Sequence, residues 1–191
     1  MTEKKLDKEK EILREAAQGS EEAFGLLYET YVDRIYNYIY YRTGNIHDAE
    51  DLTARVFQRA MKHIPKYEDR GVPFSAWLYR IAHNLVANWH RDRSRKKEIT
   101  ITEKMSLPAL QEHPEKTLMR TEEQDALLRL LRTLPPNRQQ LLILKFVENY
   151  SNAEIGKIMG RSEGAVKSLY HRTLLALREE VDDLRLEIEG E

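Results

Sequence analysis

The stretch SNAEIGKIMGRSEGAVKSLYHR, from Ser151 to Arg172, decides the fold of the C-terminal part of this chain. Ser151 precedes Glu154 by three residues, the spacing of a capping box, in which each side chain accepts a hydrogen bond from the other residue's backbone N–H. This predicts a helix over residues 152–159. Gly160 suits the left-handed end of that helix, and Ser162 suits the cap of a second one. Two helices joined by so short a turn form a helix-turn-helix.

The second helix, expected from Glu163 to about Leu184, has two different sides. At about 100° per residue, its apolar side carries Val166, Leu169, Tyr170, Thr173 and Leu177. Its polar side carries Gly164, Lys167, Ser168 and His171, with Arg172 flanking. Any amphipathic surface helix has a polar side, so this pattern alone favours simple exposure to solvent. The absence of acids between Gly164 and Arg178, with short donors beside long cations, instead favours insertion into the major groove of DNA.

Composition limits the classes of protein that this chain can belong to. Its 191 residues are 41% hydrophobic and 33% charged, which suits one or two small helix-rich domains. No apolar run approaches the roughly 20 residues of a membrane span, and residues 1–17 lack the apolar stretch of a secretory signal. We therefore expect a cytoplasmic protein without membrane insertion. The chain has no cysteine, which excludes disulfides and thiolate metal sites, and its net charge of −1 means that polyanion binding depends on local clusters.

Glycine, proline and charge divide the chain into two helical blocks with an irregular segment between them. From Ile99 to Thr117 the sequence mixes β-branched residues, two prolines and scattered charge, and a linker of that length is uncommon inside a compact domain. The sequence therefore predicts an all-α protein of two small helical domains. The remaining helices are expected at residues 7–17, 21–42, 48–64, 74–95, 118–133 and 137–148.

The helix expected over residues 74–95 supplies a second polar surface. Its apolar side carries Phe74, Leu78, Ile81, Ala82, Leu85 and Trp89. Its opposite side carries Arg80, His83, Asn84, Ala87, His90 and Arg91. Between residues 83 and 97, five basic residues stand against one acid, and this mixture of basic, amide and aromatic groups suits unpaired bases and their phosphates. We assign Trp77 to packing, and we consider His83 and His90 too isolated to form a metal pair.

These residues together resemble bacterial sigma factors of the extracytoplasmic-function group, the minimal two-domain members of the sigma-70 family. The resemblance rests on DAEDLTARVFQRAMKHI (48–64), FSAWLYRIAHN (74–84) and LPPNRQQLLILKFVENYSNAEIGKIMGRSEGAVKSLYHR (134–172). It covers nearly all of the chain from about Ser20 to Glu179. It implies an alternative sigma factor that binds core RNA polymerase and directs promoter-specific initiation of transcription.

The resemblance also implies a division of labour along the chain. Residues 1–96 would bind core polymerase, recognise the minus-ten element and hold the melted non-template strand. Residues 97–117 would be a linker, and residues 118–191 would read the minus-thirty-five element in duplex DNA and end in an acidic tail.

The implied polymerase contacts are Asp48, Glu50, Asp51, Ala54, Arg55 and Gln58. The implied minus-ten contacts are Asp69, Arg70, Gly71, Arg80, His83, Asn84, Ala87 and Arg91, with the loop from Asp69 to Pro73 at the place of a captured base. The implied minus-thirty-five contacts are Arg161, Ser162, Glu163, Gly164, Lys167, Ser168, His171 and Arg172.

The sequence departs from the family pattern at several positions. Ala54 and Arg55 stand where the family commonly has Gln and Glu. Leu169 and Leu174 stand where it has arginines in the recognition helix. Fewer cations mean fewer phosphate contacts, so we expect the same docking with a different or weaker sequence preference.

The implied mechanism uses no cofactor, metal or small-molecule substrate, because the polymerase performs the bond chemistry. An anti-sigma factor is a further candidate partner.

Two other classes of protein remain as alternatives. A stand-alone helix-turn-helix regulator would bind duplex DNA without polymerase, usually as a dimer. An enzyme would need the carboxylates of Asp48, Glu50 and Asp51 to act together, but helical spacing spreads them around the axis.

Overall fold

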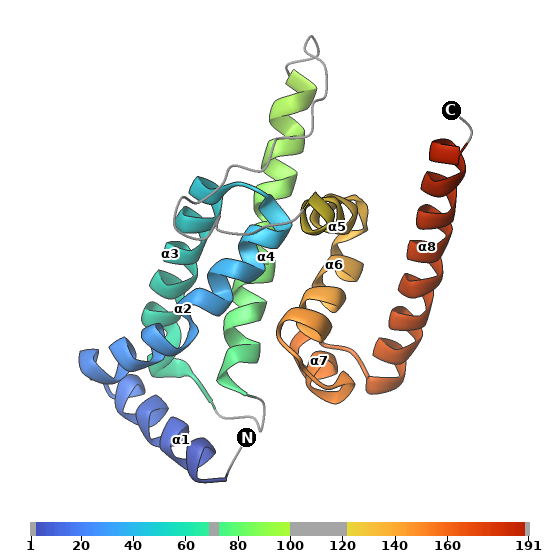
Figure 1. The fold of residues 1–191 in the computed structure, drawn as a ribbon. Helices are drawn as coiled ribbons and strands as arrows, with labels where there is room; N and C mark the ends of the chain where they lie inside the picture. The colour runs from blue at the N-terminus through green and yellow to red at the C-terminus, as the bar shows by residue number, and fades with distance from the viewer. Residues whose placement is uncertain (1–2, 69–72, 100–121, 190–191) are drawn as a thin grey trace. The chain divides into compact units, whose positions relative to one another are not determined.

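A computed structural model describes residues 3–68, 73–99 and 122–189 of the chain. Every element in these ranges is helical, which confirms the predicted all-α class (Figure 1). Contacts divide the chain into two units, residues 1–132 and 133–191, and each unit is described separately. The elements are α1 (Glu3–Ala17), α2 (Glu21–Thr43), α3 (Ile46–His63), the 3₁₀ turn η1 (Ile64–Lys66), α4 (Phe74–Ile99), α5 (Glu122–Thr133), α6 (Pro136–Leu142), the π-helical segment η2 (Ile143–Val147), α7 (Asn152–Met159) and α8 (Glu163–Glu189).

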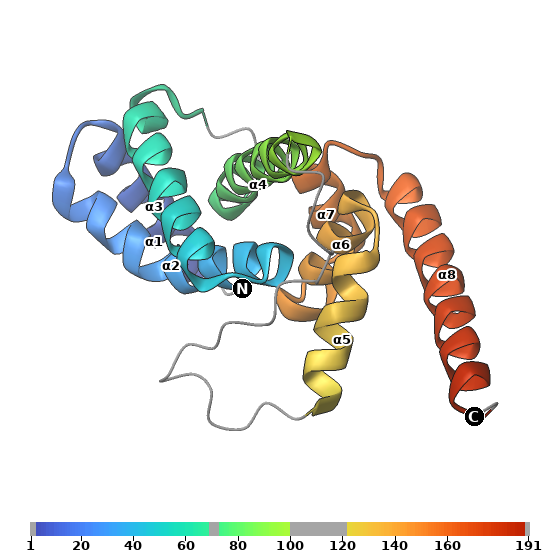
Figure 2. The ribbon, with the colours of Figure 1, turned by 90° about the horizontal axis from the view of Figure 1, so that it is seen from above.

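The N-terminal unit is built around α2, which packs against α1, α3 and α4 (Figures 1 and 2). Ser20 caps α2, since its Oγ accepts a hydrogen bond from the Ala23 N–H at 3.2 Å. Asn45 caps α3 in the same way, with its Oδ1 3.0 Å from the Asp48 nitrogen. The packing of α4 on α2 and α3 fixes which side of α4 faces outward. The core is apolar and aromatic, and its fully buried members include Ile35, Tyr38, Ile39, Val56, Leu78, Tyr79 and Val86.

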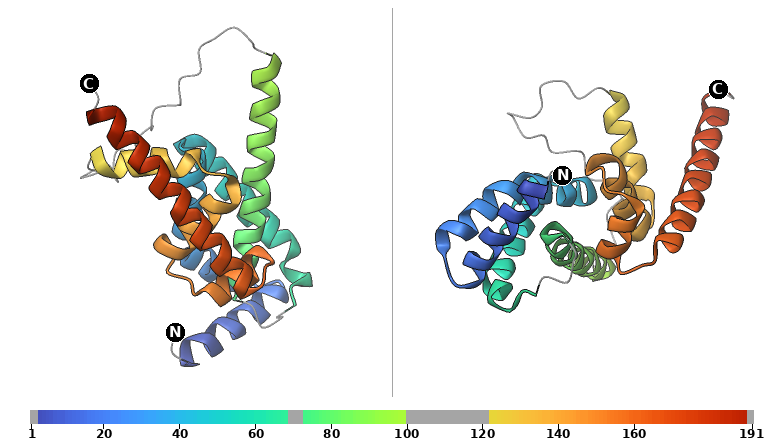
Figure 3. Two further views of the ribbon diagram at one scale, coloured as in Figure 1. Left: turned by 90° about the vertical axis from the view of Figure 1, so that its right-hand side faces the viewer. Right: turned by 90° about the horizontal axis from the view of Figure 1, so that it is seen from below.

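The C-terminal unit packs α6, η2 and α7 together and sets α6 and α7 against α8. Leu141, Leu144, Ile155 and Val166 are fully buried at its centre. The helix expected over residues 137–148 is α-helical only as far as Leu142, and continues as a π-helical segment from Ile143 to Val147. Figure 3 shows α8 continuing past α7 as one long helix.

The predicted helices agree with the structure in number and order within the described ranges, and differ at their ends. α4 continues to Ile99 rather than ending near Arg95, and α8 continues to Glu189 rather than ending near Leu184. The predicted linker lies mostly outside the described ranges, so the domain boundaries at residues 96 and 118 stay predictions. No helix in the described ranges combines the length and the apolar character that a bilayer crossing requires.

Candidate nucleic-acid interface

The helix-turn-helix of α7 and α8 is built as the sequence predicts. Ser151 Oγ accepts from the Glu154 N–H at 3.3 Å, and Glu154 Oε2 accepts from the Ser151 N–H at 2.8 Å. The Ser151 hydroxyl also donates to Glu154 Oε2 at 2.7 Å, and this bond is the largest cause of a lowered pKa at Glu154. Gly160 ends α7 with a φ of +66°, and Ser162 Oγ caps α8 by accepting from the Ala165 N–H at 3.2 Å.

The tight turn between these helices depends on Gly156, which sequence reasoning did not single out. The Arg161 N–H donates to the Gly156 carbonyl at 2.8 Å. A Cβ added at Gly156 would lie 2.7 Å from the Arg161 carbonyl oxygen, so the position has no room for a side chain. A glycine in the interior of a short predicted helix was the signal for this close approach.

α8 separates a buried side from an exposed side, as its periodicity predicts. Val166, Leu169 and Thr173 are buried, and Tyr170 and Leu177 are half-buried. Every residue implied in minus-thirty-five recognition is exposed: Arg161, Ser162, Glu163, Gly164, Lys167, Ser168, His171 and Arg172. A buried position would have prevented contact with DNA, so this exposure is compatible with the predicted role.

Three of the exposed groups on α8 interact with their own helix. Lys167 Nζ lies 2.8 Å from Glu163 Oε1, an exposed pair that is worth about 0–1 kcal/mol at most. Ser168 Oγ donates to the Gly164 carbonyl at 3.0 Å, and Arg172 Nε donates to the Ser168 carbonyl at 3.3 Å. These exposed interactions are weak, so replacing them by contacts with a ligand costs little free energy. The side chains therefore remain available for binding.

α4 exposes most of its predicted contacts but turns its histidines inward. Arg80, Asn84, Ala87 and Arg91 are exposed. His83 and His90 are half-buried against the end of α2. Arg91 Nη2 donates to Asn88 Oδ1 at 2.7 Å on the same helix. Asp69, Arg70 and Gly71, the remaining predicted minus-ten contacts, lie outside the described residues.

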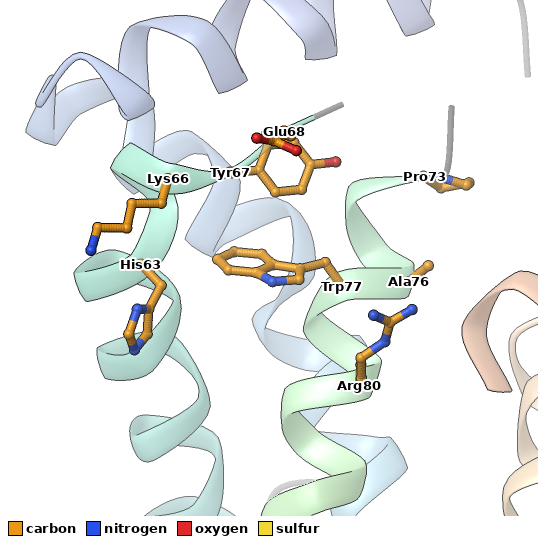
Figure 4. Close-up of a pocket in the computed structure, with 8 residues that line it drawn as sticks. All are labelled: His63, Lys66, Tyr67, Glu68, Pro73, Ala76, Trp77 and Arg80. Atoms are coloured by element: carbon orange, nitrogen blue, oxygen red, sulfur yellow. The ribbon is translucent and has the colours of Figure 1, made fainter. Parts of the chain in front are cut away.

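A hollow of about 390 Å³ lies beside the start of α4 (Figure 4). The Trp77 ring projects into it from α4, with ring-centre distances of 5.3 Å to Tyr67 and 5.4 Å to Phe74. Trp77 is half-buried, so its packing role, which we predicted, accounts for only part of its surface. Pro73, the last residue of the predicted base-capture loop, reaches the rim. The lining residues are His63, Lys66, Tyr67, Glu68, Pro73, Ala76, Trp77 and Arg80.

Arg42, in the last turn of α2, contacts the two α4 histidines and adds to the lowering of their pKa values. Its Nη1 lies 3.2 Å from His83 Nδ1. Burial, and then the Arg42 charge, lower the pKa of His83 to about 4. Burial also lowers the pKa of His90 to about 4, helped by the charges of Arg42 and Arg93 and opposed by a hydrogen bond to the Arg42 backbone. Both imidazoles are therefore neutral at pH 7.

The predicted polymerase-binding side of α3 is open to solvent. Glu50, Asp51, Ala54, Arg55 and Gln58 are exposed, whereas Asp48 is half-buried. Next to them, α2 and α3 form a second hollow of about 310 Å³. Its lining mixes aromatic and acidic side chains: Tyr28, Val32, Asp33, Tyr36, Glu50, Thr53 and Ala54.

The acids at the start of α3 do not converge on one centre. Asp48 Oδ2 lies 3.7 Å from Arg93 Nη1, and Asp51 Oδ2 lies 3.6 Å from Arg55 Nη1. Glu50 Oε2 lies 3.8 Å from a different group, His47 Nδ1. In the part of the chain that the structure describes, no group of three or more His, Asp or Glu side chains is placed to hold a metal ion.

Comparison with known proteins assigns the chain to a family. The family models "Sigma-70 region 2" and "Sigma-70, region 4" match residues 27–96 and 124–177. The ECF RNA polymerase sigma factor SigW of Bacillus subtilis is 33% identical over 187 residues, which cover 92% of this chain and 97% of SigW. The chain belongs to the extracytoplasmic-function group of the sigma-70 family. As an alternative sigma factor, it directs RNA polymerase to specific promoters.

Other similar proteins agree with this assignment. The ECF RNA polymerase sigma factor BldN of Streptomyces coelicolor is 38% identical to this sigma factor over 167 residues, which cover 87% of this chain and 63% of BldN. The solved structure of CnrH in complex with the cytosolic domain of CnrY matches with a TM-score of 0.68 at 21% identity, over 90% of this chain and 96% of that one. RpoE of Bartonella quintana, solved with the anti-sigma factor NepR, matches with a TM-score of 0.64 at 21% identity, over 83% of this chain and 96% of that one. At this identity the two structures show a shared fold.

The two matched regions divide the predicted site residues of the sigma factor between them. Region 2 contains the implied polymerase and minus-ten contacts, and region 4 contains the implied minus-thirty-five contacts. Sequence reasoning missed Arg42 and most of the lining of the Trp77 hollow. Aromatic residues on both sides of a Gly- and Pro-containing loop, Tyr67 and Trp77, were the available signal for the hollow.

Proposed function

We propose that the sigma factor recognises a promoter through three separate surfaces. The exposed side of α4 and the Trp77 hollow hold the melted non-template strand of the minus-ten element. The exposed side of α8 enters the major groove of the minus-thirty-five element, and the exposed side of α3 docks on core RNA polymerase. One observation carries this proposal. Of the implied contacts in the described ranges, all but Asp48 and His83 are exposed, and those two are half-buried.

The Trp77 hollow suits one unpaired base. Its volume of about 390 Å³ falls in the range of small-molecule pockets, and aromatic rings form one wall. Arg80 and Lys66 at its edge supply cations for the flanking phosphates. A base stacked on an aromatic side chain gains about 1–3 kcal/mol, enough to offset much of the cost of unstacking it from the duplex.

The polymerase supplies the chemistry in this scheme. We propose that the sigma factor is not an enzyme, needs no cofactor, and acts in the cytoplasm, where the polymerase and the chromosome are found. Its own binding energy only shifts promoter DNA toward the melted form, because trapped bases cannot return to the duplex.

We further propose that an anti-sigma factor holds the protein inactive by covering these surfaces. Support comes from the solved neighbours, since RpoE of Bartonella quintana was solved with the anti-sigma factor NepR. The two-unit construction would let one inhibitor cover surfaces on both units.

Transcription from fragmented genomic DNA tests the proposed function. The full chain is added to core polymerase of the source bacterium, and the 5′ ends of the transcripts are sequenced. We expect defined start sites that share upstream sequences about two helical turns apart, and none without the chain. Tight, sequence-specific binding of promoter duplex by the chain alone, without such transcripts, would instead identify a stand-alone regulator.

Two substitutions locate the melting function at the hollow. Trp77→Ala should reduce open complexes about 5- to 100-fold through lost stacking. Arg80→Gln changes an exposed side chain and should reduce them without affecting the fold. Leu26→Ala is the matched control, since Leu26 is 49% exposed and does not line the hollow. Circular dichroism confirms that each variant is folded, and equal melting by all three variants would contradict the assignment.

A further inference from the structure

Arg42 is a buried cation for which the described residues provide no carboxylate partner. Its side chain is 1% exposed, Nη1 donates to the Tyr38 hydroxyl at 2.8 Å, and its guanidinium lies 5.4 Å from the centre of the Tyr38 ring. Nε and Nη2 have no hydrogen-bond partner among the described residues. The positive charge of Arg42 is therefore left to act on the neutral groups around it.

The Arg42 contact determines which nitrogen of His83 carries the hydrogen. A guanidinium has only donors, so His83 Nδ1, 3.2 Å from Arg42 Nη1, has to accept. In a neutral imidazole the other nitrogen, Nε2, then carries the hydrogen. Protonation of Nδ1 would place an N–H against an N–H and a second charge beside Arg42, which agrees with the lowered pKa of His83.

We propose that Arg42 is a positioning residue that locks His83 as a neutral Nε2–H donor, and that this donor reads an acceptor on a base edge of the melted minus-ten strand. The inference rests on the proposed role of α4 in strand binding. His83 is half-buried on α4 between the exposed Arg80 and Ala87, next to Asn84, and its ring contacts Arg42 through Nδ1, so the second ring nitrogen, Nε2, is the one that can face a ligand.

The neutral state of the ring favours a base over a phosphate. A phosphate is bound most strongly by a cation, and α4 already exposes Arg80 and Arg91 for that purpose. A neutral, directional donor adds little attraction for phosphate but discriminates between base edges that present an acceptor and those that present a donor. The groups that bear on His83 are Arg42 and, behind it, Tyr38 from α2, with His90 two turns along α4.

Nitrogen-15 NMR of the full chain tests the tautomer without any DNA. Long-range spectra of labelled histidine distinguish Nε2–H, Nδ1–H and the doubly protonated ring. We expect His83 to be the Nε2–H tautomer at pH 7 and to stay neutral at pH 5.5. An Nδ1–H tautomer at pH 7, or a charged ring at pH 5.5, would overturn the proposal.

Arg42→Met removes the donor while keeping a long apolar side chain in the buried site. In this variant we expect a mixture of His83 tautomers and titration at a higher pH than in the unchanged protein. An unchanged pure Nε2–H tautomer in a folded Arg42→Met protein would show that Arg42 does not position the ring. If the variant does not fold, Arg42→Gln tests the same point, because an amide carries no charge and can accept a hydrogen bond as well as donate one, so it does not force Nδ1 to be the acceptor.

A pair of His83 substitutions separates packing from base reading. His83→Asn keeps an acceptor near the position of Nδ1, whereas His83→Gln keeps an amide donor near the position of Nε2. With polymerase and a promoter fragment from the transcription assay, His83→Asn should weaken open complexes about 3- to 10-fold, the effect of one lost hydrogen bond, and His83→Gln should remain within about 2-fold. Equal effects of the two substitutions, or the reverse order, would overturn the proposal.

The site of the lost contact follows from single-base changes in the minus-ten element. We expect His83→Asn to lose discrimination at one base position while keeping it at the others. A uniform loss over all sequences would indicate a phosphate contact and overturn the base assignment. If Trp77→Ala and Arg80→Gln also leave promoter melting unchanged, the proposed function of α4 is wrong as well. If these two substitutions impair melting but the His83 substitutions do not, only the proposal for His83 is wrong.

Discussion

The helices α4 and α8 both carry implied DNA contacts, but they present them in different ways. On α8, every such contact is exposed, and the recorded interactions of Lys167, Ser168 and Arg172 are with residues of the same helix. On α4, His83 and His90 are half-buried and bound to Arg42 of another helix. The chemistry of the α8 surface is therefore local, whereas that of the α4 surface depends on tertiary packing.

This difference matches the two tasks. A helix that reads an intact major groove needs an orientation and a set of free side chains, which a capped helix and a tight turn provide. A surface that holds extruded bases needs a hollow and neutral groups in fixed orientations, which only several elements together can provide.

A side chain at position 156 should prevent the turn between α7 and α8 from closing and so change the orientation of α8. Gly156→Ala places a Cβ 2.7 Å from the Arg161 carbonyl, so we expect the free energy of unfolding of the C-terminal unit to fall by about 1–3 kcal/mol. Hydrogen exchange of the α7 and α8 amides measures this effect. Gly164→Ala is the control, because position 164 has open space and should be neutral or slightly stabilising. Equal stability of the two variants would contradict the close approach.

The start of α7 should weaken when its capping box is removed. Ser151→Ala removes both hydrogen bonds of the hydroxyl and should cost about 1 kcal/mol. It should also raise the pKa of Glu154, because the largest cause of the lowering is lost. Ser151→Thr keeps a hydroxyl and serves as the control in thermal unfolding and carboxyl titration by NMR. An unchanged Glu154 titration in Ser151→Ala would show that the box does not govern this carboxyl.

The α4 histidines should make the N-terminal unit sensitive to mild acid. Their folded pKa values, about 4, lie below the value of about 6.5 in an unfolded chain, so the unfolded state binds more protons between these pH values. Their contribution to stability is complete above pH 6.5 and is lost as pH falls toward 4. With allowance for solvent screening, we expect a loss of about 0.5–1 kcal/mol between pH 7.5 and 5.

Denaturant unfolding at the two pH values measures this loss. The double variant His83→Gln, His90→Gln lacks both titrating groups and should show a smaller difference between pH 7.5 and 5. The same difference in both proteins would mean that other groups cause the acid sensitivity.

The smallest effect on stability is expected at Lys167. Lys167→Gln breaks an exposed pair with Glu163 and should change the free energy of unfolding by less than about 0.5 kcal/mol. It should nevertheless lower the slope of log affinity against log salt by about 0.9 for polymerase-bound sigma factor on promoter duplex. Arg178→Gln, farther along α8, should leave this slope unchanged. Equal slopes for all three proteins would exclude a phosphate contact at Lys167.

The two helices also differ in how far the sequence could predict them. Capping box, glycine turn and periodicity are local signals, so the helix-turn-helix and the exposed side of α8 could be predicted residue by residue. The contacts of His83 and His90 could not, because they are made with Arg42, which is 41 residues away from His83 in sequence. Arg42 itself carried no local signal, since a buried guanidinium is rare and periodicity alone would assign it to solvent.

The Trp77 hollow could be predicted only in part from the sequence. Its aromatic residues could be recognised in the sequence, but packing and base binding both require an aromatic residue there. Only the positions of Tyr67 and Trp77 in the lining of a common hollow separate the two roles. The π-helical turn at Ile143 was also beyond prediction, because its sequence reads as an ordinary apolar helix.

The most direct test of the central claim is permanganate oxidation of unpaired thymines in the minus-ten element of a promoter identified by transcription. We predict strong reactivity when the full chain and core polymerase are both present, almost none with either alone, and a large loss with Trp77→Ala. Undiminished reactivity with Trp77→Ala and Arg80→Gln, or melting by the chain without polymerase, would contradict the account.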